Sequence, residues 1–215
     1  MKKALVLMIA VVALTFTAFV APAGATGKVV TIGSYAANNA FPWWGASYNA
    51  MRFQCLWVQS EIGYAGYINK IEWNRGTYTT TGTFNQVRVW LCHSSKTVLE
   101  STFANNYTGN TPVAVRTSST YVVPGGPNYV DMPITPNTFN YNNTSNLLME
   151  IRWNGDTGTT CYCWRSPVAS RRVSANSDTA TTGTVWSNSQ HIRLTIGTMT
   201  GIAPTSLGRI KGLYN

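Results

Sequence analysis

The sequence predicts an all-β protein, an antiparallel jelly-roll-like β-sandwich of about ten short strands. Many short segments alternate between apolar and polar side chains, as strands do, because neighbouring side chains on a strand point to opposite faces. Clusters of Gly, Asn, Thr, Ser and Pro separate these segments and supply turns. No helical stripe is longer than two turns. A Greek-key barrel is the second arrangement that fits this pattern.

The expected strands follow one another from the start of the mature chain. In residues 51–58 both alternating sets contain apolar side chains, so we expect this strand to be covered on both faces. An irregularity within residues 66–73 predicts a β-bulge. The segment 34–49 is expected to be a long aromatic loop. The other expected strands are residues 28–32, 87–92, 113–115, 121–123, 129–134, 147–153, 161–165, 171–175 and 191–196.

The first 25 residues have the features of a secretory signal peptide. Lys2 and Lys3 precede an apolar run over residues 4–20, and Ala23-Gly24-Ala25 forms a small-residue cleavage site. We therefore expect a signal peptide over 1–25, a β-sandwich domain over 26–197, and a C-terminal tail over 198–215. The tail is a possible sorting or strand-donor segment. No membrane span is expected after cleavage, because no second apolar stretch follows.

The charge of the chain does not predict nucleic acid as a partner. The 16 basic and 7 acidic residues give a net charge of +9, but the positive charges are scattered rather than clustered. Arg171 and Arg172 are the only adjacent basic pair of the mature chain. We interpret most of these side chains as solvated strand faces. An acidic glycan or an anionic cell surface is the alternative partner.

Several short motifs of the chain resemble a known module when they are taken in order. These are Ile32-Gly33, Ser60-Glu61-Ile62-Gly63, Ala65-Gly66-Tyr67-Ile68, Val87-Arg88-Val89-Trp90-Leu91, Tyr107-Thr108-Gly109, Phe139-Asn140-Tyr141 and Asn146-Leu147-Leu148-Met149-Glu150-Ile151. The chain resembles an uncharacterised β-sandwich module of secreted bacterial surface proteins, which is often joined to fibronectin-type domains and a C-terminal sorting segment. The resemblance implies a sandwich fold and a secreted, extracellular or cell-surface location, and it carries over no catalytic residues.

The four cysteines predict disulfides, since an exported chain meets oxidising conditions. Cys55, Cys92, Cys161 and Cys163 allow three pairings, and the sequence leaves the choice open. A zinc site built from Cys92, His93, Cys161 and Cys163 is the alternative, although the spacing of the last two is unusual for zinc. Free core thiols are the third possibility. No cofactor and no metal site are expected. A turn at Asn154-Gly155-Asp156 could supply only a weak calcium site.

No enzyme motif is present, so we expect no enzymatic activity and no catalytic residue. A glycosidase would need two carboxylates across a cleft. The candidates are Glu61, Glu72, Glu100 and Glu150, and for Glu150 an ion pair with Arg152 is the simpler interpretation.

The tryptophans point to a different function. Trp57, Trp73 and Trp153 follow strand patterns and are expected in the core. Trp43, Trp44 and Trp164 are the candidate ligand-binding residues, because exposed aromatic rings stack on sugars.

Two non-enzymatic hypotheses follow from these observations. The first is a secreted structural or adhesive protein of the cell surface or extracellular matrix, whose partners are copies of itself or other surface proteins. Residues 26–32 or 201–214 would donate a strand to a neighbouring copy in a self-assembling filament or sheath. The alternative is a carbohydrate-binding module whose partners are glycans.

Overall fold

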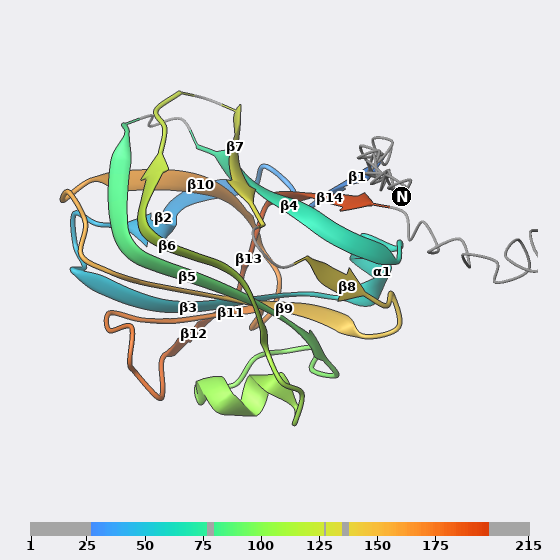
Figure 1. Ribbon diagram of the computed structural model, residues 1–215. Helices are drawn as coiled ribbons and strands as arrows, with labels where there is room; N and C mark the ends of the chain where they lie inside the picture. Colours follow the sequence, from blue (N-terminus) through green and yellow to red (C-terminus); the bar gives the residue numbers. More distant parts are fainter. Residues whose placement is uncertain (1–26, 77–79, 127, 135–137, 198–215) are drawn as a thin grey trace, which may run out of the picture.

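The computed structural model describes residues 27–76, 80–126, 128–134 and 138–197 of the 215-residue chain. Within these residues, fourteen strands form two antiparallel sheets that pack against each other (Figure 1). The predicted all-β sandwich is therefore confirmed. The expected signal peptide and C-terminal tail lie outside the described residues.

Sheet A contains eight strands arranged around a long central strand, β4 (Gly66–Arg75). On one side β4 pairs with β14, and on the other side it pairs with β7 and β8. Strand β10 pairs with β2 and β13, and it also meets β4 at Cys163. The bounds of these strands are β1 (Lys28–Ile32), β2 (Ala37–Trp44), β7 (Asn128–Pro133), β8 (Phe139–Tyr141), β10 (Thr160–Ser166), β13 (Ser189–Gln190) and β14 (Ile192–Gly197).

Sheet B contains six strands in the order β12-β11-β3-β9-β5-β6. Its two outermost strands differ in length, because β12 has three residues and β6 has eleven. A short helix, α1 (Gln59–Ile62), follows β3. The strand bounds are β3 (Ala50–Trp57), β5 (Gly82–Ser94), β6 (Val113–Val123), β9 (Asn146–Asn154), β11 (Arg172–Ala175) and β12 (Thr184–Trp186).

The main core lies between the two sheets. On β3 the side chains of Met51, Phe53, Cys55 and Trp57 alternate toward this core, where each is fully buried. Trp57, Trp73 and Trp153 are also fully buried, as the sequence predicts. Burial of large aromatic side chains supplies much of the stabilisation of such a core.

A second, smaller core covers the outer face of sheet B. The 3₁₀-helix η1 (Phe103–Tyr107), drawn in green below the sheets in Figure 1, packs on this face. This explains why β3 is apolar on both faces, which the sequence pattern of residues 51–58 predicts. The buried members of the cluster are Leu56, Cys92, Leu99, Phe103, Leu148 and Val173.

The strands expected from alternation are present, and the bulge in residues 66–73 is confirmed. The pairing of β4 with β14 shifts register between Lys70 and Ile68, so that Asn69 has no partner on β14. The expected strands 113–115 and 121–123 form one continuous strand, β6. Residues 28–32 pair with β14 of the same sheet, which leaves no free donor strand among the described residues at this end.

The aromatic loop expected over residues 34–49 is wrong for most of its length. Residues 37–44 form strand β2, which pairs with β10. The segment does not alternate between apolar and polar residues, and it contains Pro42, which usually argues against a strand. The proline is tolerated because, within the part of the chain that the structure describes, β2 pairs only with β10, so one edge of β2 needs no ladder hydrogen bonds.

Candidate functional site

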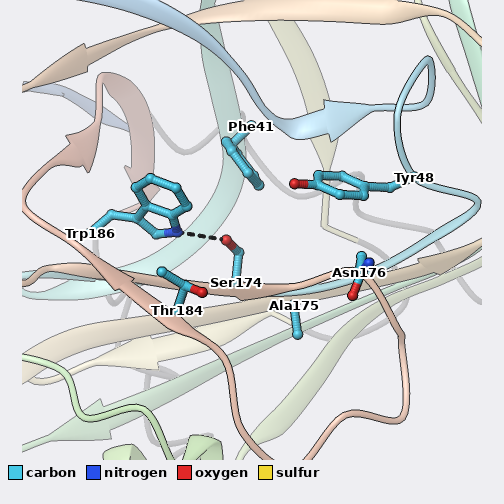
Figure 2. Close-up of a pocket in the computed structure, with 7 residues that line it drawn as sticks. All are labelled: Phe41, Tyr48, Ser174, Ala175, Asn176, Thr184 and Trp186. Atoms are coloured by element: carbon cyan, nitrogen blue, oxygen red, sulfur yellow. Dashed lines mark hydrogen bonds between the residues drawn. The ribbon is translucent and has the colours of Figure 1, made fainter.

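A pocket of about 230 Å³ opens where the edges of the two sheets meet (Figure 2). Phe41 on β2 and Tyr48 in the following loop form one wall, while β11, β12 and the turn between them form the other. We call this the edge pocket. Its lining residues are Phe41, Tyr48, Ser174, Ala175, Asn176, Thr184 and Trp186.

Strand register places the polar lining of the edge pocket on the inner face of sheet B. Arg172 lies beside Cys55 and opposite Trp186, while Ser174 lies beside Phe53 and opposite Thr184. Cys55 and Phe53 belong to the main core. The same inner face is therefore apolar at β3, polar at β11 and mixed at β12, where it presents both Thr184 and Trp186. The pocket is the part of the space between the sheets that the apolar core does not fill.

Aromatic rings from both sheets meet at the edge pocket. The ring of Phe41 lies 5.3 Å from Trp44 and 6.0 Å from Trp186, measured between ring centroids. Trp44 in turn contacts Tyr48 at 5.1 Å in an edge-to-face arrangement. Such pairs stabilise each other beyond the area they bury. They join β2 to β12 across the opening between the sheets.

Trp186 is held in place by a hydrogen bond from its ring. Its Nε1 donates to Oγ of Ser174 at 3.0 Å, the bond drawn as a dashed line in Figure 2. Although its nitrogen has an acceptor, the side chain remains 38% exposed. A large apolar ring is therefore fixed in orientation at the mouth of a pocket that also offers the polar groups of Thr184 and Asn176.

A second pocket of about 250 Å³ adjoins the first and shares Phe41 and Trp186 with it. We call this the arginine pocket because two guanidinium groups line it. Its lining residues are Asn39, Phe41, Trp44, Arg165, Arg172, Trp186 and Asn188.

Arg172 is the most unusual side chain of the arginine pocket. It is only 2% exposed, and its guanidinium carbon lies 4.4 Å from the ring centre of Phe41 and 5.0 Å from that of Trp186. Its Nε and Nη1 have no hydrogen-bond partner among the described residues. Burial, together with the nearby charge of Arg165, lowers the pKa of Arg172 to about 9, so the side chain is still a cation at neutral pH.

Glu150, on the outer face of sheet B, is a buried charge of the opposite kind. Its carboxylate accepts hydrogen bonds from Arg52 Nη2 at 3.0 Å and from Gln54 Nε2 at 2.6 Å. It also accepts from the hydroxyl of Tyr107 and from Nε of Arg152. The ion pair with Arg152 that the sequence predicts is confirmed. Every carboxylate oxygen of Glu150 has a partner within the chain.

The four candidate carboxylates do not meet across a cleft. Glu150 is on β9 of sheet B, whereas Glu72 is on β4 of sheet A. The carboxylate of Glu72 pairs with Nη2 of Arg193 at 2.6 Å. Glu61 pairs with Arg171, and Glu100 pairs with Lys96. Each of the four carboxylates therefore pairs with a different cationic side chain.

The structure distributes the three predicted ligand-binding tryptophans differently. Trp43 is in β2 rather than in a loop, and its side chain is fully buried against Trp73, Phe84 and Tyr121. Trp44 is partly buried and lines the arginine pocket. Trp164 is partly buried beside Tyr35, and it lines neither pocket.

The cysteines are all buried and all free in this structure, which differs from the expected disulfides. Cys92 lies in the outer cluster of sheet B, whereas Cys55, Cys161 and Cys163 lie in the main core. Sheet B therefore separates Cys92 from the other three thiols. Burial raises the pKa of Cys55 and of Cys163 to about 12 and that of Cys92 to about 11, which keeps these thiols protonated.

The zinc alternative is wrong for the same reason. Its four proposed ligands fall in different layers of the sandwich, with Cys92 outside sheet B and the Cys161–Cys163 pair in the core. Across the part of the chain that the structure describes, no three His, Cys, Asp or Glu side chains are grouped as a metal site requires.

Phe41, Tyr48, Arg172 and Trp186 are not among the site residues predicted from the sequence. The sequence distinguishes Arg172 only as a member of an adjacent basic pair, whereas in the structure the aromatic residues of β2 and β12 cover its side chain. The pattern of residues 172–175 does place Arg172 and Ser174 on one face. It does not show that this face adjoins β2, more than 120 residues earlier in the sequence.

Comparisons with protein-family models, with curated proteins and with solved structures found no match to this chain. The resemblance to a secreted surface module therefore stays a prediction. Among the described residues, no helix has the length and apolar character needed to cross a membrane.

Proposed function

We propose that this protein is a non-enzymatic glycan-binding module of the cell surface or extracellular matrix, and that a sugar lies in the edge pocket. The observation that carries the proposal is the fixed, 38% exposed ring of Trp186 at the mouth of that pocket. An indole held in one orientation can stack on the apolar face of a pyranose ring, and it loses little conformational entropy when it does so.

The other lining residues support a sugar over a purely apolar ligand. Tyr48 lies across the pocket from Trp186, while Ser174, Asn176 and Thr184 border its floor (Figure 2). Hydroxyl and amide groups beside aromatic rings match the alternating apolar faces and hydroxyl edges of a saccharide.

Isothermal titration calorimetry of the purified protein, with oligosaccharides chosen from a glycan array, tests this proposal. We expect Trp186→Ala to weaken binding at least tenfold, which is about 1.4 kcal/mol, because the stacking surface is removed. Trp186→Phe keeps an aromatic ring and is expected to retain part of the affinity.

Trp90→Ala is the matched control for this experiment. Trp90 stacks with Arg88 and Arg152 in sheet B, and it lines neither pocket. Equal losses in Trp186→Ala and Trp90→Ala, or no glycan binding by the wild-type protein, would refute the proposal.

Self-assembly is a second candidate function, favoured by strand β6. This eleven-residue strand is an edge of sheet B and, among the described residues, pairs only with β5, so its other edge can accept a strand from a second copy. Val122 is 50% exposed on this strand.

A charge on an edge strand opposes such pairing, so Val122→Lys should abolish assembly. Electron microscopy and light scattering would detect the loss of polymers. Polymers that form equally well in Val122→Lys, or a wild-type protein that is monomeric at high concentration, would argue against assembly through β6.

A further inference from the structure

We infer that the arginine pocket binds the carboxylate of an acidic sugar, so that the glycan recognised by this protein contains uronic acid. The inference rests on the proposed function and names the class of its ligand. It is drawn from two guanidinium groups, Arg172 and Arg165, that line a pocket adjoining the edge pocket and have no acidic partner among the described residues.

The burial of Arg172 without hydrogen-bond acceptors for its Nε and Nη1 among the described residues favours a partner from outside the chain. A buried cation that is neither paired nor hydrogen-bonded is destabilising, and folded proteins rarely retain one. The rings of Phe41 and Trp186 stabilise its positive charge at 4.4 and 5.0 Å. These ring contacts satisfy none of its N–H donors, and Nε and Nη1 remain without an acceptor. A planar carboxylate accepts two parallel N–H bonds from such a group.

The acidic residues of the chain are committed elsewhere. Six of the seven acidic side chains pair with a cation outside the arginine pocket, and the seventh, Asp156, accepts a hydrogen bond from the backbone of Gly158. The six paired residues are Glu61, Glu72, Glu100, Asp131, Glu150 and Asp178. Arg172 and Arg165 therefore add two positive charges to one pocket with no counter-charge among the described residues.

Arg165 strengthens the preference for an anion. Its charge is close enough to disfavour the charged form of Arg172, and its own Nε is buried without a hydrogen-bond acceptor. A bound carboxylate would relieve this repulsion and accept hydrogen bonds from both groups. The two arginines come from different sheets, on β10 and β11, so this arrangement depends on the closed sandwich.

The same region also offers acceptors for hydroxyl groups. Oδ1 of Asn188, which lines the arginine pocket, is buried with no donor. Oε1 of Gln190 is also without a donor, while the Nε2 of that residue donates to Asn39 at 3.4 Å. Unpaired N–H donors beside unpaired carbonyl acceptors match a ligand that carries both an anionic group and hydroxyls. Uronic acids have both, next to an apolar ring face suited to Trp186.

Calorimetry with matched saccharides tests the inference. The probes are oligogalacturonate, oligoglucuronate and oligoalginate, the methyl esters of the same oligomers, and a sulfated neutral oligosaccharide. We expect at least one uronate to bind ten or more times more tightly than its methyl ester, because the ester lacks the negative charge. We also expect this preference to weaken as salt concentration rises.

Arg165→Gln and Arg172→Met should each remove the preference for the acid over its ester. Arg165 is only partly buried, so its variant keeps the test valid if Arg172→Met alters folding. Arg88→Gln is the matched control, since Arg88 pairs with Asp178, lines neither the edge pocket nor the arginine pocket, and should leave the preference unchanged when substituted.

The outcomes separate the inference from the proposed function. If acid and ester bind equally and Trp186→Ala abolishes both, the inference is overturned while glycan binding remains. If the sulfated oligosaccharide alone binds and depends on the arginines, the carboxylate assignment is overturned. If no saccharide binds, the proposed function fails, and the inference fails with it.

Discussion

Glu150 and Arg172 are both buried charges on sheet B, yet their surroundings are opposite. Glu150 on the outer face receives hydrogen bonds from Arg52, Gln54 and Tyr107, and it pairs with Arg152. Arg172 on the inner face contacts two aromatic rings, and its Nε and Nη1 have no hydrogen-bond acceptor among the described residues. The comparison separates a charge whose partners are built into the fold from one whose partner must come from outside. The first is expected to stabilise the structure, and the second belongs to the binding site that we propose.

The largest expected effect comes from removing the charge that is fully paired. Glu150→Ala leaves Arg52 and Arg152 without their carboxylate, and breaking a buried pair in this way destabilises a protein by about 3–5 kcal/mol. Urea denaturation would measure the fall in the free energy of unfolding. Asp131→Asn removes the carboxylate of an ion pair that is mostly exposed, and it should change stability very little. Equal effects of the two substitutions would remove the contrast.

Glu72 in sheet A extends the comparison to pH. Burial alone would raise the pKa of Glu72, but hydrogen bonds from Arg193 and Lys70 outweigh it and lower this pKa to about 2. Because the folded-state pKa lies below that of the unfolded chain, this group stabilises the fold above about pH 4.5. That contribution is lost as pH falls from about 4.5 to 2.

Thermal unfolding between pH 2 and pH 6 measures this loss. In Arg193→Met the decline in melting temperature over the same range should be shallower, because the folded-state pKa of Glu72 returns toward 4.5. An unchanged slope in the variant would show that other groups control acid unfolding.

An effect of opposite sign, smaller than that of Glu150→Ala, is expected from the unpaired charge. In Arg172→Met, an apolar side chain of similar length replaces a buried cation, and such replacements are neutral or stabilising by about 1–4 kcal/mol. We expect the free energy of unfolding to rise by about 1 kcal/mol, at the low end of this range, since the ring contacts of the guanidinium are also lost. Calorimetry without ligand tests this, and strong destabilisation would assign Arg172 a structural role like that of Glu150.

On sheet B, the features that the sequence predicts are those that depend on local residue spacing. The strands that were found, such as β3 and β9, alternate regularly because each packs on the core along its whole length. The Glu150–Arg152 pair was predictable because both residues are two apart on one strand. Local spacing contains the information needed in these cases.

The edge pocket depends on contacts that local spacing does not contain. Strand β2 was missed because its Phe41-Pro42-Trp43-Trp44 run is apolar throughout and includes a proline. Trp43 and Trp44 are adjacent, and only the pairing of β2 with β10 sends Trp43 to the core and leaves Trp44 at the arginine pocket. The local sequence does not show that aromatic residues of β2 and β12 cover Arg172.

The walls of the edge pocket belong to different sheets. Phe41 on β2 of sheet A and Tyr48 in the loop after β2 form one wall, and strands β11 and β12 of sheet B form the other. A ligand that contacts both walls therefore bridges the two sheets of the sandwich. Its occupancy and the spacing of the sheets are thermodynamically linked, and the link is reciprocal. Mechanical separation of the sheets would lower the affinity for the ligand, and a bound ligand would raise the force needed to separate the sheets.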